Sequence, residues 1–255
     1  MLDDDFVARA RQLYVPEMGT ESIAPMLYWL IRTLRPRRAL EVGMGFTTAY
    51  LARALADNVA ADDDERRRMD DSDFAETNPM AHRPYYDDPY DPHLLCIDRM
   101  ADPSSSAPRA FPVLQNLGLD RYCSVIEGDL RGSSPAVAER FDTVDFAWID
   151  TWDTLAFVRE YWPIIDAAGG VLAVHYLMTY PEGRAVQHYL RSLAGPDNGR
   201  LEITNLLEPH KFGQNSLTLV RRIRDYVEPE DLRPQGSAND PVGILAADAA
   251  GAART

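Results

Sequence analysis

Short apolar runs that lead to an acidic residue alternate with amphipathic stretches along most of this chain. Residues 39–40 lead to Glu41, residues 93–97 to Asp98, and residues 122–128 to Asp129. Apolar positions recur with helical spacing over 21–34 and again over 46–55. Strands that alternate with helices predict a parallel sheet covered by helices. Its carboxyl edge, where such sheets bind ligands, would gather the three carboxylates.

A turn with two glycines joins the first predicted strand to the helix after it. Gly43 and Gly45 have no Cβ atom, so backbone amides have room to close on a ligand, and Thr47 and Thr48 add donors at the start of the helix. Phe46 stands where a dinucleotide-binding loop would carry more glycine. We therefore expect a ligand bound without phosphates, although any tight strand-to-helix turn has a use for two glycines.

The ordered set of these motifs resembles the class I S-adenosylmethionine-dependent methyltransferases, especially the small-molecule O-methyltransferase-like branch that reads Glu-x-Gly-x-Gly-aromatic-Ser/Thr-Thr. The likeness covers residues 14–222, and residues 141–150, 168–175 and 214–221 resemble the fourth, fifth and last strands of that family. It implies an α/β Rossmann-like sandwich: a mostly parallel seven-stranded sheet with an antiparallel last strand and helices on both faces.

The resemblance also implies S-adenosylmethionine as the cofactor. The two glycines would pack against its methionine part above Glu41, Asp98 would accept hydrogen bonds from the ribose hydroxyls, and Asp129 would read the adenine amino group. Asp150 would lie at the mouth of the site. The cofactor-binding residues predicted in this way are Thr20, Glu41, Gly43, Gly45, Thr47, Thr48, Asp98, Gly128, Asp129, Asp150 and Trp152.

The chain divides into a helical cap over 1–36, a cofactor-binding domain over 37–223, and a loose tail over 224–255 that is rich in Pro, Ala, Asp and Gly. Residues 57–92 interrupt the domain with blocks of charge followed by a tyrosine cluster. We see no strand or long helix period there, and connections longer than about 15 residues are usually functional or disordered. We favour a lid or dimer arm over disorder.

Composition narrows the class of partner. The 255 residues suffice for one α/β domain with a good core. A formal charge of -14 repels a nucleic-acid backbone, although an acidic balance is also compatible with a merely solvated surface. No apolar run approaches the roughly 20 residues that span a bilayer, and the polar start is no signal peptide. We expect a cytoplasmic enzyme with a small-molecule substrate, no nucleic-acid or membrane partner, and a homodimer as one option.

The expected catalytic residues are His175, Asp150 and His210. His175 ends a predicted buried strand at the catalytic edge, and imidazole titrates near neutrality, so it is our first choice of general base. A histidine satisfied by a backbone carbonyl is the alternative, and His210, in the loop before the last strand, is the second choice. Aromatic residues would form the substrate pocket: Tyr14, Tyr85, Tyr86, Trp152, Tyr176, Tyr180 and Phe212.

One branch of the resembling family uses a divalent metal and a lysine soon after the fourth-strand aspartate. Here that aspartate is Asp150, the single lysine is Lys211, and His175 and Tyr176 replace the branch's acidic-amide pair. We therefore predict a metal-independent enzyme, although Asp150, Asp153 and His175 remain an alternative oxygen-and-imidazole site.

Three functions stay open. The leading one is methyl transfer to an O or N of a small biosynthetic intermediate. The second is cyclisation of the cofactor's aminocarboxypropyl arm with release of methylthioadenosine, because an intramolecular displacement needs no acceptor base. The third is cofactor binding without catalysis.

Overall fold

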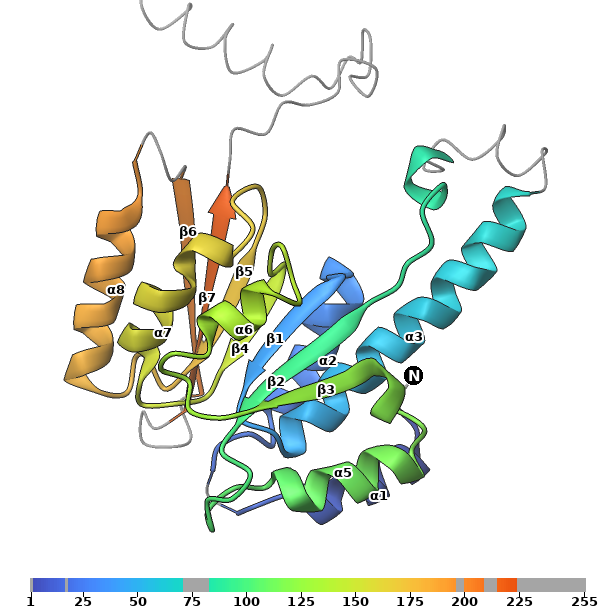
Figure 1. Ribbon diagram of the computed structural model, residues 1–255, viewed down its shortest axis with the longest axis horizontal. Helices are drawn as coiled ribbons and strands as arrows, with labels where there is room; N and C mark the ends of the chain where they lie inside the picture. The colour runs from blue at the N-terminus through green and yellow to red at the C-terminus, as the bar shows by residue number, and fades with distance from the viewer. Residues whose placement is uncertain (1, 17, 71–82, 196–199, 209–214, 224–255) are drawn as a thin grey trace, which may run out of the picture. The chain divides into compact units, whose positions relative to one another are not determined.

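The computed structural model describes residues 2–16, 18–70, 83–195, 200–208 and 215–223. Seven strands form one sheet in the order β3-β2-β1-β4-β5-β7-β6 (Figure 1). Six of them run parallel, and β7 runs antiparallel between β5 and β6. The strands are β1 (Arg38–Val42), β2 (His93–Asp98), β3 (Cys123–Glu127), β4 (Phe146–Ile149), β5 (Val171–His175), β6 (Arg200–Leu207) and β7 (Ser216–Ile223). The predicted fold class is confirmed.

Helices cover both faces of the sheet, because successive strand residues point to opposite sides. Ala39 and Trp148 pack with one helical layer, whereas Leu40 and Ala147 pack with the other. The first layer holds α1 (Asp4–Ala10), η1 (Arg11–Leu13), α2 (Ile23–Leu34), α3 (Phe46–Met69), α5 (Ala107–Asn116) and η3 (Asp120–Tyr122). The second holds α6 (Ser134–Ala138), α7 (Thr154–Tyr161), η4 (Trp162–Ile164) and α8 (Pro181–Leu193).

Helix α3 is longer than the sequence analysis predicted. We ended this helix at Leu55 and saw no helical period beyond residue 57, whereas α3 continues for 24 residues to Met69. The acidic block precedes the basic block by about one turn, so Asp62 pairs with Arg66 and Asp64 with Arg68 at i,i+4 spacing. Charge blocks that we interpreted as a loop are therefore rows of ion pairs along a helix.

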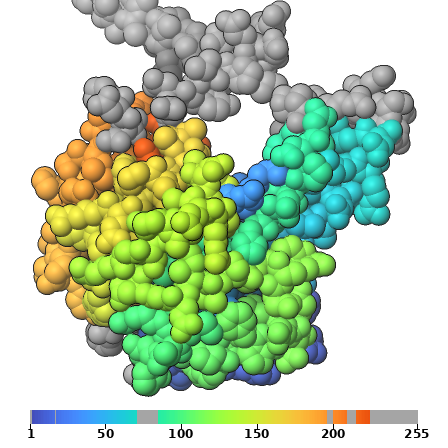
Figure 2. All heavy atoms as spheres, viewed as in Figure 1, coloured from blue at the N-terminus to red at the C-terminus, as the bar shows by residue number. Residues whose placement is uncertain are grey.

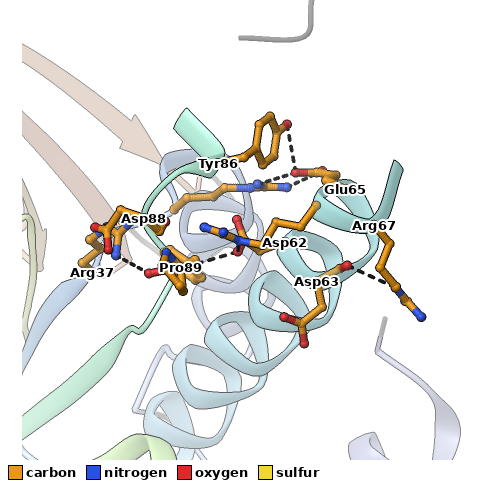
Figure 3. A network of polar contacts seen from close by, with 11 residues as sticks. Arg37, Asp62, Asp63, Glu65, Arg67, Tyr86, Asp88 and Pro89 are labelled. Carbon is orange, nitrogen blue, oxygen red and sulfur yellow. Dashed lines mark hydrogen bonds and ion pairs between the residues drawn. The ribbon is translucent and has the colours of Figure 1, made fainter. Parts of the chain in front are cut away.

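The segment after residue 82 packs on the end of this helix (Figure 3). In η2 (Arg83–Tyr86), the Tyr86 hydroxyl donates to Glu65, which also accepts two hydrogen bonds from Arg35 at 2.6 and 2.7 Å. The Tyr90 N–H donates to Asp62, and the Tyr90 hydroxyl donates to the Pro36 carbonyl. The described part of the 57–92 insertion thus lies beside the start of β1, at the amino edge of the sheet.

The sequence analysis assigned no strand to the residues of β6. Strand β6 is an edge strand that pairs only with β7, and exposed residues alternate with half-buried ones along it. Such a strand lacks the apolar run that revealed the central ones. Among the described residues, no helix is long and apolar enough to cross a membrane.

Candidate functional site

A cavity of about 320 Å³ opens at the carboxyl edge of the sheet, around the ends of β1 to β4. Small-molecule sites usually measure roughly 300–1,000 Å³, and β1 lies at the switch point of the strand order, where open α/β sheets bind ligands. Most of the predicted cofactor-binding residues line it: Thr20, Glu41, Gly43, Gly45, Thr47, Asp98, Gly128, Asp129 and Asp150. Thr48 and Trp152 are not in its lining.

The glycine turn forms the floor of the cavity. Gly43 has a φ of 94°, which side chains rarely adopt, and its N–H donates to the Ile97 carbonyl at 2.8 Å. A Cβ on Gly45 would meet the Cβ of Ser106 at 3.1 Å, so glycine lets the turn approach the next loop. The Gly45 N–H donates to the Thr48 hydroxyl at 2.7 Å. Thr48 thus supports the turn from inside the protein.

Glu41 lies beneath this turn with 1% of its surface exposed. The Thr47 hydroxyl donates to one carboxyl oxygen at 2.6 Å, and the Cys96 thiol faces the other at 3.6 Å. Burial raises the pKa of Glu41 to about 8, although both donors oppose the shift. Burial therefore favours the uncharged acid form of this side chain.

Two further carboxylates border the cavity at the ends of neighbouring strands. Asp98 is nearly buried and accepts a hydrogen bond from the Ser105 hydroxyl at 2.6 Å. Asp129 accepts the Arg131 N–H at 2.9 Å and lies 3.6 Å from a guanidinium nitrogen of Arg99. The loop 99–106 also lines the cavity, and sequence reasoning missed it. The serine run 104–106, directly after the second strand, was the available signal.

A chain of polar side chains lies behind Asp150. Its carboxylate contacts Nδ1 of His175 at 2.8 Å, and Nε2 of the same ring contacts Oδ1 of Asn215 at 2.7 Å. The Asn215 amide nitrogen donates in turn to Glu208. With the amide in this orientation, both ring nitrogens face oxygen atoms of protein side chains.

His175 itself is buried, and it does not line the cavity. Our first choice of general base therefore has both ring nitrogens occupied by protein partners. Such a ring is poorly placed to take a proton from a ligand, whereas Asp150 is partly exposed and borders the cavity. Asn215 was missed by sequence reasoning, because nothing in the chain marks an amide at the start of the last strand as a histidine partner.

Three aromatic side chains, which we call the aromatic shelf, lie together beyond Asp150: Trp152, Tyr176 and Tyr180. The Trp152 ring stacks parallel to Tyr176 at 6.2 Å and meets Tyr180 edge-on at 4.6 Å. Tyr176 also stacks on His175 at 3.6 Å, has an unusual φ of 59°, and donates its hydroxyl to the Met18 carbonyl. With 76% of its surface exposed, Trp152 has free area for a ligand.

None of the described residues that were predicted to bind the substrate is in the lining of the cavity, the three of the aromatic shelf included. Tyr85 and Tyr86 lie in η2 at the amino edge of the sheet, whereas the glycine turn lies at its carboxyl edge. Tyr14 does not line the cavity, but it packs edge-on against Phe46, which does line it. His210 and Phe212 fall outside the described residues, as do residues 71–82 and the predicted tail.

The carboxylates at the cavity do not assemble a metal site. Within the described part of the chain, no group of three or more His, Cys, Asp and Glu side chains is arranged to hold a metal ion. In the alternative set Asp150, Asp153 and His175, Asp153 pairs with Arg131 at 2.7 Å. His175 is occupied as described above.

Comparison with known proteins gives matches at the level of structure. No family model and no curated protein matches the sequence. The O-methyltransferase from Bacillus cereus in complex with SAH is 14% identical with a TM-score of 0.59, covering 88% of this chain and 93% of that one. The chain therefore has the fold of the class I S-adenosylmethionine-dependent methyltransferases.

Two further structures share this methyltransferase fold. TomG from Streptomyces achromogenes, an O-methyltransferase involved in tomaymycin synthesis and solved with SAM, is 16% identical with a TM-score of 0.56, covering 88% of this chain and 92% of that chain. The SAH-bound methyltransferase PaMTH1 from Podospora anserina is 12% identical with a TM-score of 0.56, covering 88% of this chain and 89% of its own.

Proposed function

We propose that this protein is an S-adenosylmethionine-dependent methyltransferase that modifies an oxygen or nitrogen of a small molecule. One observation carries the proposal: the glycine turn, Asp98, Asp129 and Asp150 border a single cavity at the switch point of a methyltransferase fold. Several proteins that share the fold were solved with SAM or SAH bound, which supports the same cofactor here.

The residues present fit such a cofactor. The turn leaves room for the methionine part above Glu41, because Gly43 presents backbone without a side chain. Asp98 and Asp129 line the cavity, which supports the proposal that Asp98 accepts hydrogen bonds from the ribose hydroxyls and that Asp129 lies beside the adenine. When bound, the cofactor supplies a methyl group on a sulfonium.

Asp150 is the proposed general base. When the methyl group passes from the sulfonium sulfur to the acceptor oxygen or nitrogen, the acceptor would lose its proton, and the Asp150 carboxylate, which borders the cavity, would take it. His175 would act as a positioning residue. Its hydrogen bond fixes the direction of the carboxylate, and Asn215 and Glu208 fix the imidazole.

The aromatic shelf supports an acceptor with a planar or aromatic part. The exposed Trp152 ring and the two tyrosines offer apolar faces beyond Asp150, and aromatic faces also favour a nearby sulfonium cation. Catalysis by this set of residues needs no metal: the carboxylate takes the proton, and positioning supplies much of the rest. Metal independence, the small-molecule substrate class, cytoplasmic location and a homodimer remain predictions.

The test is a product analysis. The full-length protein is incubated with deuteromethyl-labelled S-adenosylmethionine and a panel of phenols, catechols and aromatic amines, with and without a metal chelator. We expect S-adenosylhomocysteine to form only with an acceptor that gains the label, and the chelator to have no effect. Methylthioadenosine as the main product would instead establish cyclisation, and binding without turnover across the panel would favour a non-catalytic protein.

Variants test the assignment of roles. We expect Asp150→Asn to lower kcat at least 100-fold with S-adenosylhomocysteine affinity kept within threefold. We expect His175→Gln to lower kcat less and to alter the pH profile of kcat, since the carboxylate loses the imidazole that it contacts. Asp142→Asn removes one exposed carboxylate from the loop that leads into β4 and serves as the control. If Asp150→Asn kept full turnover, Asp150 would not be the base.

A further inference from the structure

A second cleft lies at the amino edge of the sheet, opposite the cofactor cavity. Its lining comes from the starts of β1, β2 and β3, from η3, and from the residues before β4. Figure 2 shows the surface hollowed on this side, between the blue residues at the start of β1 and the green segments around them. Because a strand rises about 3.3 Å per residue, roughly 16 Å separates Arg38 here from Gly43 at the other edge. Methyl transfer does not use this cleft.

Three arginines border the cleft: Arg38, Arg121 and Arg140. None of them forms an ion pair with a carboxylate of a described residue. Their guanidinium groups donate instead to neutral acceptors: the Asp91 carbonyl at 3.1 Å, the Tyr122 hydroxyl at 2.9 Å, and the Ser124 hydroxyl at 3.5 Å.

The cleft gathers these three arginines although the chain as a whole is acidic. The chain has 40 acidic against 26 basic residues. Several arginines elsewhere in the described chain pair with carboxylates, as Arg66 does with Asp62 at 2.6 Å and Arg131 with Asp153 at 2.7 Å. The cleft is thus a patch of positive charge on an otherwise acidic molecule.

Aromatic rings hold two of the guanidinium groups in place. Arg38 lies over the Phe141 ring at 5.7 Å, and Arg121 over the Tyr122 ring at 4.8 Å. The ring contacts the face of the guanidinium, so the N–H groups that do not donate to Asp91 or Tyr122 remain for a further acceptor. Two of the three arginines, Arg121 and Arg140, are exposed, so their N–H groups are open to a ligand from solvent.

His93 lies between these arginines and is sensitive to their charge. Burial lowers its pKa, and Arg38 and Arg140 lower it further, against the opposite effect of Asp91. Its Nε2 contacts the Ser124 hydroxyl at 2.7 Å, so a neutral imidazole and a hydroxyl complete the polar lining. Asp91 is the one carboxylate among the lining residues, and it is exposed.

We propose that this cleft binds a small molecule through a phosphate or diphosphate group. Guanidinium forks match the oxygens of phosphate in pairs, and Arg–phosphate hydrogen bonds are among the strongest that proteins form. Converging arginines without carboxylate partners provide the charge for a dianion. The site does not depend on the methyltransferase proposal, because it shares no lining residue with the cofactor cavity.

Calorimetric titration of the full chain with inorganic pyrophosphate tests the proposal. Phosphate and citrate serve as comparison anions, and S-adenosylhomocysteine is added to saturation in a parallel series. We expect pyrophosphate to bind more tightly than citrate of similar charge, and its binding to persist with S-adenosylhomocysteine present. Arg121→Gln and Arg140→Gln should each weaken it at least tenfold, and Arg140→Lys, which keeps the charge but loses the fork, by a smaller factor.

Arg184→Gln is the matched control, since Arg184 is an exposed arginine on α8 and does not line the cleft. It should leave pyrophosphate affinity within twofold. Three results would overturn the proposal: equal affinity in the wild type and both Gln variants, displacement of pyrophosphate by S-adenosylhomocysteine, or citrate binding as tightly as pyrophosphate. Both arginines are exposed, so the variants should fold, and a thermal melt checks this.

Discussion

Replacing Glu41 with Gln tests the buried acid beneath the glycine turn. Burial raises the Glu41 pKa from its ordinary value of 4.5 to about 8 in the folded protein. Between these two pH values the folded state holds a proton that the unfolded state has lost, so stability falls as pH rises. Because one pKa unit corresponds to about 1.4 kcal/mol, the full loss is about 5 kcal/mol as an order of magnitude.

Glutamine has the same shape and never ionises, so Glu41→Gln removes this pH dependence while Thr47 keeps an acceptor. The assay is urea unfolding of wild type and variant at pH 5, 6, 7 and 8. The free energy of unfolding of the variant, relative to wild type, should rise by up to about 1.4 kcal/mol per pH unit across this range. Glu139→Gln, at an exposed position after α6, controls for the loss of a surface carboxylate.

A difference in unfolding free energy that does not change with pH would refute this reasoning. It would mean that Glu41 is ionised in the folded protein and that its charge is compensated inside the fold.

Three further predictions concern the cavity. Asp98→Ala should weaken S-adenosylhomocysteine binding about 10- to 150-fold in calorimetry, because hydrogen bonds to a charged acceptor contribute about 1.5–3 kcal/mol. Asp142→Ala should have no effect on this binding. An unchanged affinity in the Asp98 variant would show that Asp98 does not bind the ribose. Gly43→Ala should lower the free energy of unfolding by about 1–3 kcal/mol in urea and also weaken the binding of S-adenosylhomocysteine. Gly118→Ala, at a φ of 64° outside the cavity, should lower the free energy of unfolding but leave that binding unchanged. Trp152→Ala should leave stability within about 0.5 kcal/mol, since the ring is mostly exposed, but should raise the acceptor KM; an unchanged KM would remove Trp152 from the acceptor site.

The central strands were predictable because each is buried on both faces. The runs that end at Glu41, Asp98 and Asp150 follow from this burial, and the order of acidic residues then placed the cavity. Edge strand β6 has one exposed face and no comparable run, so its position was missed. The second half of α3 was missed because it has no apolar period; its charged residues form i,i+4 ion pairs instead, such as Asp62 with Arg66.

At the carboxyl edge of the sheet, too, some features could be predicted from the sequence and others could not. Position along the strand correctly brought His175 to the end of β5, but its role depends on which groups its two nitrogens face. Those groups, Asp150 and Asn215, are 25 and 40 residues away in sequence and meet only in the folded sheet. Tyr85 and Tyr86 show the reverse case: an aromatic cluster suggested a ligand, whereas Tyr86 bonds to Glu65 of the long helix.

The central claim is that the carboxyl edge of the sheet holds an adenosyl sulfonium. A crystal structure of the full-length protein with S-adenosylhomocysteine tests it most directly. We predict the amino-acid part of the ligand over the turn at Gly43, both ribose hydroxyls on Asp98, and the adenine beside Asp129. A ligand bound elsewhere, or a cavity that stays empty at saturating concentration, would contradict the account.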